Sequence, residues 1–168
     1  SSELASAIQA CGFSFWFHSS KAAWNEFSEI NSLLTTISNQ ARIAYEHSPA
    51  HDRFGSLRAF ESLPLFANKN TLEGLYMQST ISSPFVFYSQ CEYSQVCSTP
   101  LPGYKYPGFD LANATKHLRL FNAKYLIAVS EKLKVELRHN KEWSILKKVN
   151  EYEVWNLATN PGTFVQAL

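Results

Sequence analysis

Two glutamates, Glu61 and Glu73, are the side chains in this sequence best suited to acid–base chemistry. They lie in the segment AFESLPLFANKNTLEGLYMQST (residues 59–80), on either side of the polar turn Asn68–Thr71. Paired carboxylates hydrolyse glycosides when the fold holds them about 5–10 Å apart. A glutamate within an apolar stretch more often faces solvent or pairs with a cation, and Arg58 lies close enough in sequence to pair with Glu61. The residues therefore favour a structural role first, ligand binding second and catalysis last.

Other constellations for catalysis or metal binding are incomplete. His47 and His51 share a loop, but the Ser48-Pro49 pair between them disfavours the helix on which two such histidines would bind one metal ion. The sequence has no P-loop, no dinucleotide-binding glycine motif and no nucleophile elbow. A cysteine nucleophile would need a nearby base, and Cys91 and Cys97 have none in sequence. We therefore expect no metal ion and no cofactor.

Cys91 and Cys97 are instead candidates for a disulfide. In CEYSQVC the two residues are six positions apart, which does not match the C-x2-C ligand pairs of structural zinc sites. An oxidising compartment would close them into a small disulfide loop, and a reducing compartment would leave two free thiols. Cys11 stays unpaired in either case.

The composition describes a folded chain with few charges. Of the 168 residues, 45% are hydrophobic and only 17% are charged, against about 25% in ordinary soluble domains. The net charge is +1 with Lys and Arg scattered, so we expect no nucleic-acid partner. The apolar stretch Ala5–Phe17 is shorter than the ~18 residues that span a bilayer. Residues 1–19 are expected to be either a buried first element or a lead-in that follows a removed membrane helix.

The first half of the chain predicts a helix and a strand before the glutamate segment. Apolar residues at helical spacing predict a helix over residues 20–39, and residues 41–46 predict a strand. Residues 47–56 carry Pro, Asp and Gly and predict a loop. Strand-like or irregular pieces are expected on either side of the Asn68–Thr71 turn. Residues 82–97 fit a helix or a strand, and we favour the helix.

The second half has clearer boundaries. Asp110 is placed to cap a helix, and Asn122 suits the left-handed position at its end. The apolar run over residues 124–130 predicts a buried strand, Ser130 caps a further helix, and a hairpin is expected around Asn150-Glu151. This order predicts an α/β or α+β fold, with a mixed β-sheet flanked by helices and a C-terminal hairpin. We expect one soluble domain over residues 1–168.

Three segments together resemble a family of large multi-spanning membrane proteins. They are WNEFSEINSLL, RFGSLRAFESLPLFANKNTLEGLYMQSTISSPFVFY and HLRLFNAKYLIAVSEKLK. They resemble the soluble region of proteins labelled "6-pyruvoyl-tetrahydropterin synthase-related membrane protein domain", which look like relatives of the GT-C class of membrane glycosyltransferases. The label itself does not imply pterin chemistry, because the histidines here do not form the three-histidine zinc site of true pterin synthases.

The resemblance implies an extracytoplasmic domain without activity of its own. Its catalytic carboxylates would lie between membrane helices that this chain lacks, and its partners would be the membrane-embedded remainder of the same protein and a lipid-linked sugar or glycan acceptor. Asn and Thr side chains would hydrogen-bond sugar hydroxyls, and Tyr76 would stack on a sugar ring. The candidate ligand contacts are Arg58, Glu61, Asn68, Asn70, Thr71, Glu73 and Tyr76. The alternatives are a non-catalytic protein-interaction module and a soluble glycoside hydrolase that uses Glu61 and Glu73.

Overall fold

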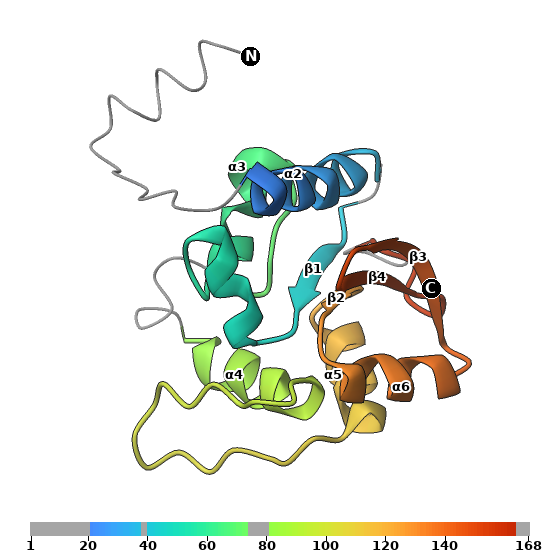
Figure 1. Cartoon of the computed structure of the whole chain (residues 1–168). Helices are drawn as coiled ribbons and strands as arrows, with labels where there is room; N and C mark the ends of the chain where they lie inside the picture. The colour runs from blue at the N-terminus through green and yellow to red at the C-terminus, as the bar shows by residue number, and fades with distance from the viewer. Residues whose placement is uncertain (1–20, 38–39, 74–80, 164–168) are drawn as a thin grey trace.

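A mixed sheet of four strands lies at the centre of the described part of the chain (Figure 1). The computed structural model describes residues 21–37, 40–73 and 81–163. The strand order is β1-β2-β4-β3. β1 and β2 are parallel, and β4 is antiparallel to both β2 and β3. The strands are β1 (Arg42–Tyr45), β2 (Ala123–Ala128), β3 (Trp143–Val149) and β4 (Tyr152–Leu157).

Helices cover both faces of this sheet (Figure 1). α2 and α3 lie on one side, and α4, α5 and α6 lie on the other. The helices are α2 (Lys21–Thr35), α3 (Leu63–Phe66), α4 (Ser83–Tyr93), α5 (Leu111–Leu120) and α6 (Glu131–His139), with 3-10 helices η1 (Pro49–Phe54) and η2 (Ala59–Ser62). The predicted α/β or α+β class, with its mixed sheet and C-terminal hairpin, is confirmed. None of the described helices is long and apolar enough to cross a bilayer.

Alternation along β1 divides the core between the two faces. Ile43 and Tyr45 pack into one apolar cluster with α2, η1 and η2, whereas Ala44 packs into a second with α5 and α6. This is the period of two that a strand imposes on its side chains. Aromatic rings pack closely in the first cluster, where the tilted rings of Phe27 and Phe54 have centroids 5.2 Å apart. The strand β1 therefore joins both layers of the core.

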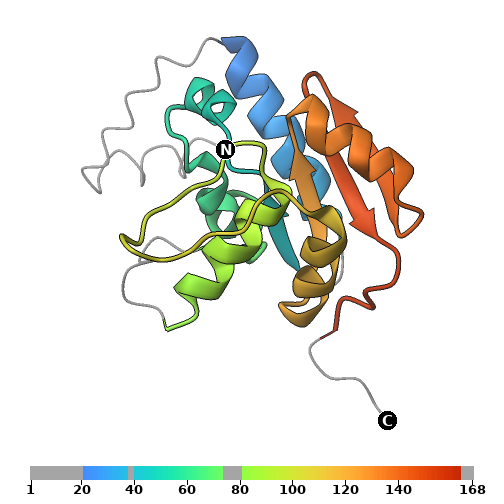
Figure 2. The ribbon, with the colours of Figure 1, turned by 90° about the horizontal axis from the view of Figure 1, so that it is seen from below.

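The expected caps of the second half are present. The Asp110 carboxylate accepts a hydrogen bond from the backbone N–H of Asn113 at 3.0 Å, and Ser130 Oγ accepts one from Leu133 at 3.3 Å. Asn122 and Asn150 both have left-handed backbone angles, with φ of 53° and 50°. These signals set the ends of α5, α6 and the hairpin. The long connection between α4 and α5 runs alongside α4 (Figures 1 and 2).

The first half departs from expectation in two places. Residues 47–56 contain the 3-10 helix η1 rather than only a loop, and the Ser48 side chain caps it. The segment before the Asn68–Thr71 turn, expected to be strand-like or irregular, is helical, and η2 runs directly into α3. Pro64 in the first turn of α3 suits a helix start. After the turn, Thr71 forms only a single parallel bridge with Ile43. Residues 1–19, with Cys11, lie outside the described residues.

Candidate functional site

Four segments bring the two glutamates together at the β1 edge of the sheet. The bridge between Thr71 and Ile43 sets Glu73, two residues on, beside Tyr45 at the end of β1. Residues two apart on an extended chain point the same way. η2 supplies Glu61, and α4 supplies Gln90. Glu61 and Glu73, paired by position in the sequence, thus meet in the structure through Tyr45.

The tyrosine hydroxyl lies between the two carboxylates. Tyr45 Oη donates to Glu73 Oε2 at 3.0 Å and lies 3.5 Å from Glu61 Oε1. Gln90 Nε2 donates to the other oxygen of Glu73, and Arg58 Nε donates to Glu61 Oε1 in an ion pair. We call these five side chains the Tyr45 cluster. Each Glu73 oxygen is therefore already occupied by a protein donor.

Burial shifts the proton affinities of this cluster. Glu73 is 7% exposed, and desolvation raises the pKa of its carboxyl group to about 7, while the hydrogen bond from Tyr45 opposes the rise. Burial also raises the pKa of Glu61, against the lowering effect of Arg58. The pKa of Tyr45 is raised well above 10 by burial and by the two carboxylates. The hydroxyl therefore remains a donor, and Glu73 exchanges its proton near neutral pH.

A carboxyl group with a pKa near 7 could act as a general acid or base. Two further buried atoms of the Tyr45 cluster, Glu61 Oε2 and Gln90 Oε1, have no hydrogen-bond partner among the described residues. Each of these oxygens has a second lone pair, but Glu73 is only 7% exposed, so a substrate would have to enter the packed contact between β1 and α4 to reach it. The arrangement therefore fits a structural role better than catalysis.

The remaining predicted ligand residues shape the turn. Asn68 is exposed with a left-handed φ of 51°, a conformation that Asn tolerates better than most residues. The backbone C=O of Asn70 accepts from Ile43 N–H at 2.8 Å, and the Thr71 hydroxyl donates to the backbone C=O of Glu73. Tyr76 lies outside the described residues. The turn places Glu73 through its backbone.

Tyr45 and Gln90 were not identified from the sequence. Tyr45 ends a predicted strand, and its position two residues from Ile43 marks it as buried, but nothing local shows what its hydroxyl contacts. Gln90 lies on α4 and is fully buried. Only the rotation of this helix about its axis could have shown that Gln90 faces β1. Phe85, on the same helix, is 62% exposed. The missing information was therefore the rotation of α4 against β1.

A second buried polar cluster closes the carboxyl ends of β1 and β2. Glu46 Oε2 accepts from the backbone N–H groups of Val129 and Ser130, both at 2.8 Å. His51 Nε2 donates to the Glu46 backbone carbonyl at 2.5 Å, which leaves Nδ1 to accept from Tyr152 Oη at 3.1 Å. Burial lowers the pKa of His51 to about 4, so the ring is neutral. The Glu46 carboxylate and the His51 ring therefore both hold backbone groups at these strand ends in place.

The metal site considered for the histidine loop is not assembled. His51 is buried, whereas His47 Nδ1 lies 3.1 Å from the backbone carbonyl of Val96. The described residues contain no group of three or more His, Cys, Asp or Glu side chains arranged to hold a metal ion.

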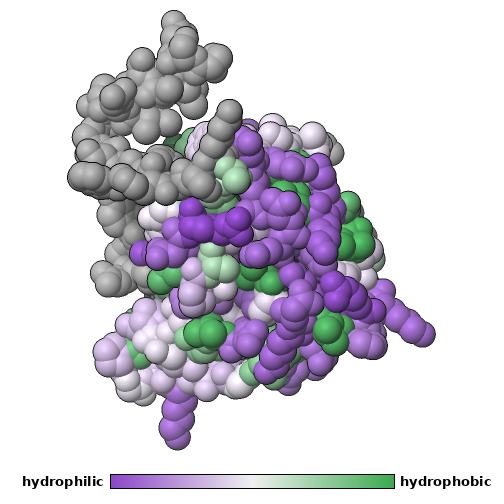
Figure 3. Space-filling view, viewed as in Figure 1, coloured by the Kyte–Doolittle hydropathy of each residue, from purple (hydrophilic) through white to green (hydrophobic). Residues whose placement is uncertain are grey.

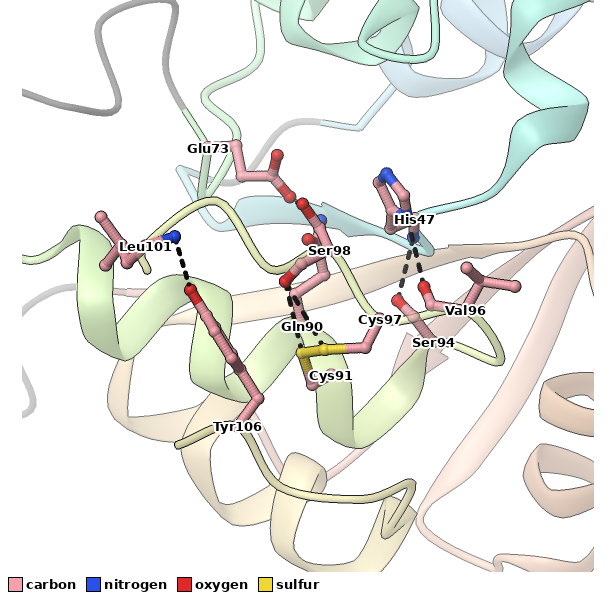
Figure 4. Close-up of a disulfide and its surroundings, with 10 residues drawn as sticks. All are labelled: His47, Glu73, Gln90, Cys91, Ser94, Val96, Cys97, Ser98, Leu101 and Tyr106. Atoms are coloured by element: carbon pink, nitrogen blue, oxygen red, sulfur yellow. Dashed lines mark hydrogen bonds between the residues drawn. A yellow bond between two sulfur atoms is a disulfide. The ribbon is translucent and has the colours of Figure 1, made fainter. Parts of the chain in front are cut away.

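Cys91 and Cys97 are joined by a disulfide in the structure (Figure 4). The bond ties the end of α4 to the segment that follows it. This segment also contacts β1's end, since Ser94 Oγ accepts from the backbone N–H of His47 at 2.9 Å. Figure 4 shows Glu73 and Gln90 on the same side of α4 as this linkage. The disulfide therefore braces the helix that supplies Gln90 to the Tyr45 cluster.

A carboxylate–imidazole pair joins α4 to α5. Glu92 Oε2 lies 2.6 Å from His117 Nδ1, and the Tyr88 ring meets the imidazole edge-on at 6.2 Å. An imidazole oriented in this way serves as a base in hydrolases when a nucleophile lies beside it. No Ser, Thr or Cys side chain is hydrogen-bonded to His117 within the described ranges. The pair anchors one helix on the other.

Comparison with known proteins identifies a family but no characterised relative. No curated protein and no solved structure matches the chain. A family model described as "Domain of unknown function (DUF8559)" matches residues 28–166. This match covers the whole sheet and every side chain of the Tyr45 cluster. The chain therefore belongs to the DUF8559 family.

Proposed function

We propose that this chain is the extracytoplasmic domain of a GT-C-like polytopic membrane protein, accessory to transfer of a lipid-linked sugar in surface-glycan assembly. The observation that carries the proposal is the disulfide between Cys91 and Cys97. Disulfides persist in oxidising compartments and are rare in the cytosol. The sequence resemblance supplies the membrane-bound remainder and the sugar.

The state of the glutamates supports an accessory rather than a catalytic role. Both oxygens of Glu73 accept hydrogen bonds from within the domain, and Glu61 is ion-paired with Arg58. Catalytic acids and bases need an open side toward the reacting atom. The parent protein would therefore keep its chemistry in the membrane, and this domain would hold an acceptor or cover the membrane site.

A non-catalytic interaction module is the alternative that a specific observation favours. Ile81 and Phe85, at the start of α4, are 94% and 62% exposed and lie four residues apart. On the face seen in Figure 3, however, hydrophobic side chains are scattered among hydrophilic ones. A docking module would carry a contiguous apolar patch, so this face supports the accessory role more than a broad docking surface.

The location can be tested with thiol labelling of the full-length protein in intact cells. In a C11S background, maleimide-PEG should add two further labels to the denatured protein only after reduction, and these two should be missing from a C91S/C97S variant. A membrane-impermeant reductant applied to intact cells should be enough to expose them. Labelling of Cys91 and Cys97 without reduction would place the domain in a reducing compartment and refute the proposal.

The accessory role can be tested by sugar transfer in membranes of cells that carry variants. Deleting residues 21–163 should abolish or strongly reduce transfer. E61Q and E73Q, at matched abundance, should keep the rate within about twofold, as should E136Q, which removes an exposed carboxylate on α6. Loss of a catalytic acid or base ordinarily costs about 10²–10⁴-fold. Such a loss in E73Q, with folding intact, would instead support the hydrolase alternative.

A further inference from the structure

A patch of aromatic side chains joins α4, α5 and the connection between these two helices. This connection runs alongside α4 (Figures 1 and 2). The Tyr88 ring on α4 meets the Tyr104 ring of the connection and the His117 imidazole of α5, with centroid distances of 6.4 and 6.2 Å. Tyr106 packs against Tyr104 with ring centroids 5.1 Å apart. We call Tyr88, Tyr104, Tyr106 and His117 the tyrosine patch.

The tyrosine patch keeps surface that is accessible to a ligand. Tyr104 is 37% exposed, and so is the His117 side chain. Tyr88 and Tyr106 are half-buried. The three ring contacts are edge-to-face, with interplanar angles between 70° and 84°, and such a contact covers one face of one ring and only the rim of the other. The rings therefore fix one another while part of their surface stays open to solvent.

Hydrogen-bonding atoms accompany this ring surface. No described residue forms a hydrogen bond with the hydroxyl group of Tyr88 or Tyr104. His117 Nδ1 lies 2.6 Å from Glu92 Oε2, and the Glu92 side chain is only 3% exposed. This carboxylate holds a proton on Nδ1 and leaves Nε2 as an acceptor on the neutral ring. The patch thus combines apolar ring surface with two hydroxyl groups and one oriented ring nitrogen.

The connection that carries Tyr104 is tied at two points. The disulfide between Cys91 and Cys97 joins its first part to α4. Further along, the backbone N–H of Leu101 donates to Tyr106 Oη at 2.9 Å. A segment that is ordered before binding loses less conformational entropy when a ligand arrives. The patch is therefore partly preorganised.

We propose that the tyrosine patch binds a glycan through the rings of its sugar units. A pyranose carries C–H groups on its faces and hydroxyl groups around its rim, which match the ring surface and the polar atoms of the patch. An organic cation would be favoured by an exposed carboxylate or an aromatic cage, and Glu92 is buried and already paired. A wholly apolar partner would leave the tyrosine hydroxyls without water or an acceptor.

The glycan would be the acceptor that the accessory role requires, so its identity rests on the proposed function. The binding surface stands apart from the Tyr45 cluster, because Tyr88 and Gln90 are two residues apart on α4 and such residues face different directions on a helix.

The test is an NMR titration of the ¹⁵N-labelled full chain with cellotriose, maltotriose and chitotriose in turn. At least one trisaccharide should give saturable shifts, confined to backbone amides of α4, α5 and the connection between them. Sorbitol has hydroxyl groups but no sugar ring and should give none. Absence of saturable shifts with all of the trisaccharides, or equal shifts with sorbitol, would overturn the proposal. Saturable binding of tetramethylammonium chloride in place of the sugars would assign the patch to a cation instead.

Variants of Tyr104 separate ring contact from other effects. Y104A should weaken trisaccharide binding by roughly threefold to tenfold, and Y104F, which keeps the ring, should weaken it less. If Y104A disturbs the connection, Y104L keeps a bulky side chain without an aromatic face and should also weaken binding. L120A removes an exposed apolar side chain at the end of α5 and should change nothing. Unchanged binding in both Y104A and Y104L would overturn the site.

The outcome for the site can be told apart from the outcome for the proposed function. Sugar binding by a chain whose Cys91 and Cys97 are labelled in cells without reduction would keep the tyrosine patch and refute the extracytoplasmic location. Absence of binding, in a chain whose two cysteines are oxidised in cells, would overturn the patch and leave the location standing.

Discussion

Replacing Glu73 by Gln should remove a pH-dependent part of the domain's stability. Burial raises the pKa of Glu73 from 4.5 to about 7 in the folded state. Between these values the folded protein binds a proton that the unfolded chain has released. The unfolding free energy therefore falls as the pH rises from 4.5 to 7. The contribution of Glu73 is fully present below pH 4.5 and absent above 7.

The size of this contribution follows from the shift. A rise from 4.5 to about 7 corresponds to about 3 kcal/mol. Glutamine keeps the shape of the neutral acid, and Gln90 can turn its amide so that its unpartnered Oε1 accepts from the new NH₂ group. E73Q should thus match wild type near pH 4.5 and exceed its stability by about 1–3 kcal/mol at pH 8.

Other titrating groups make the difference between the two proteins the quantity to measure. Burial lowers the pKa of His51 to about 4, so the domain loses stability through this residue as the pH falls from 6.5 to 4. This change opposes the trend that Glu73 produces in the wild-type curve. Around Glu73, the charged and titratable neighbours are Tyr45, Arg58, Glu61 and Tyr93. Glu61 also has a raised pKa, so the two carboxyl groups titrate as a coupled pair.

The assay is urea unfolding of wild type and E73Q under non-reducing conditions at intervals from pH 4.5 to 8.5. E136Q, an exposed carboxylate on α6, serves as the matched control and should follow wild type throughout. A stability difference between E73Q and wild type that stays constant over this range, or that falls as the pH rises, would refute a raised pKa of Glu73.

Three further changes test the surrounding contacts. Y45F should lower the unfolding free energy by about 1–3 kcal/mol. It should also move the pH midpoint linked to Glu73 above 7, because the Tyr45 hydrogen bond lowers the pKa of Glu73. An unmoved midpoint in urea titrations would contradict the contact. C91S/C97S should cost about 2 kcal/mol from loop-closure entropy, measured as a lower urea midpoint that reducing agent no longer changes. E46Q should lower the unfolding free energy by about 1–3 kcal/mol, because the new NH₂ group would face backbone donors. Faster hydrogen exchange at Val129 and Ser130 would report the loss of these hydrogen bonds.

The elements of the second half could be predicted because their signals are local. Asp110 and Ser130 cap the helices that follow them, and Asn122 and Asn150 adopt left-handed angles at the turns. Each of these choices depends on neighbours within about four residues. The hairpin and both helices of this half therefore followed from short stretches of sequence.

The first half was harder because its structure depends on distant contacts. Pro64 was a local sign of the α3 helix that the strand-like interpretation of this segment passed over. Trp24, one of the apolar residues at helical spacing in α2, is 42% exposed. The Tyr45 cluster joins residues 16 and 28 positions apart, and the orientation of α4 decides that Gln90 rather than Phe85 faces it. Spacing alone contains no such information.

The same contacts decide between the structural and catalytic interpretations of the glutamates. Taken alone, a carboxylate pair with one pKa near 7 resembles an acid–base pair. Glu73 is only 7% exposed, and a substrate that displaced Tyr45 or Gln90 to reach it would cost a hydrogen bond to a charged group, which contributes about 1.5–3 kcal/mol. The displaced donor would also be left buried without its acceptor. A proton-sensitive tie between β1 and α4 uses all of these contacts as they stand, whereas catalysis would need a path for a substrate into this packed contact.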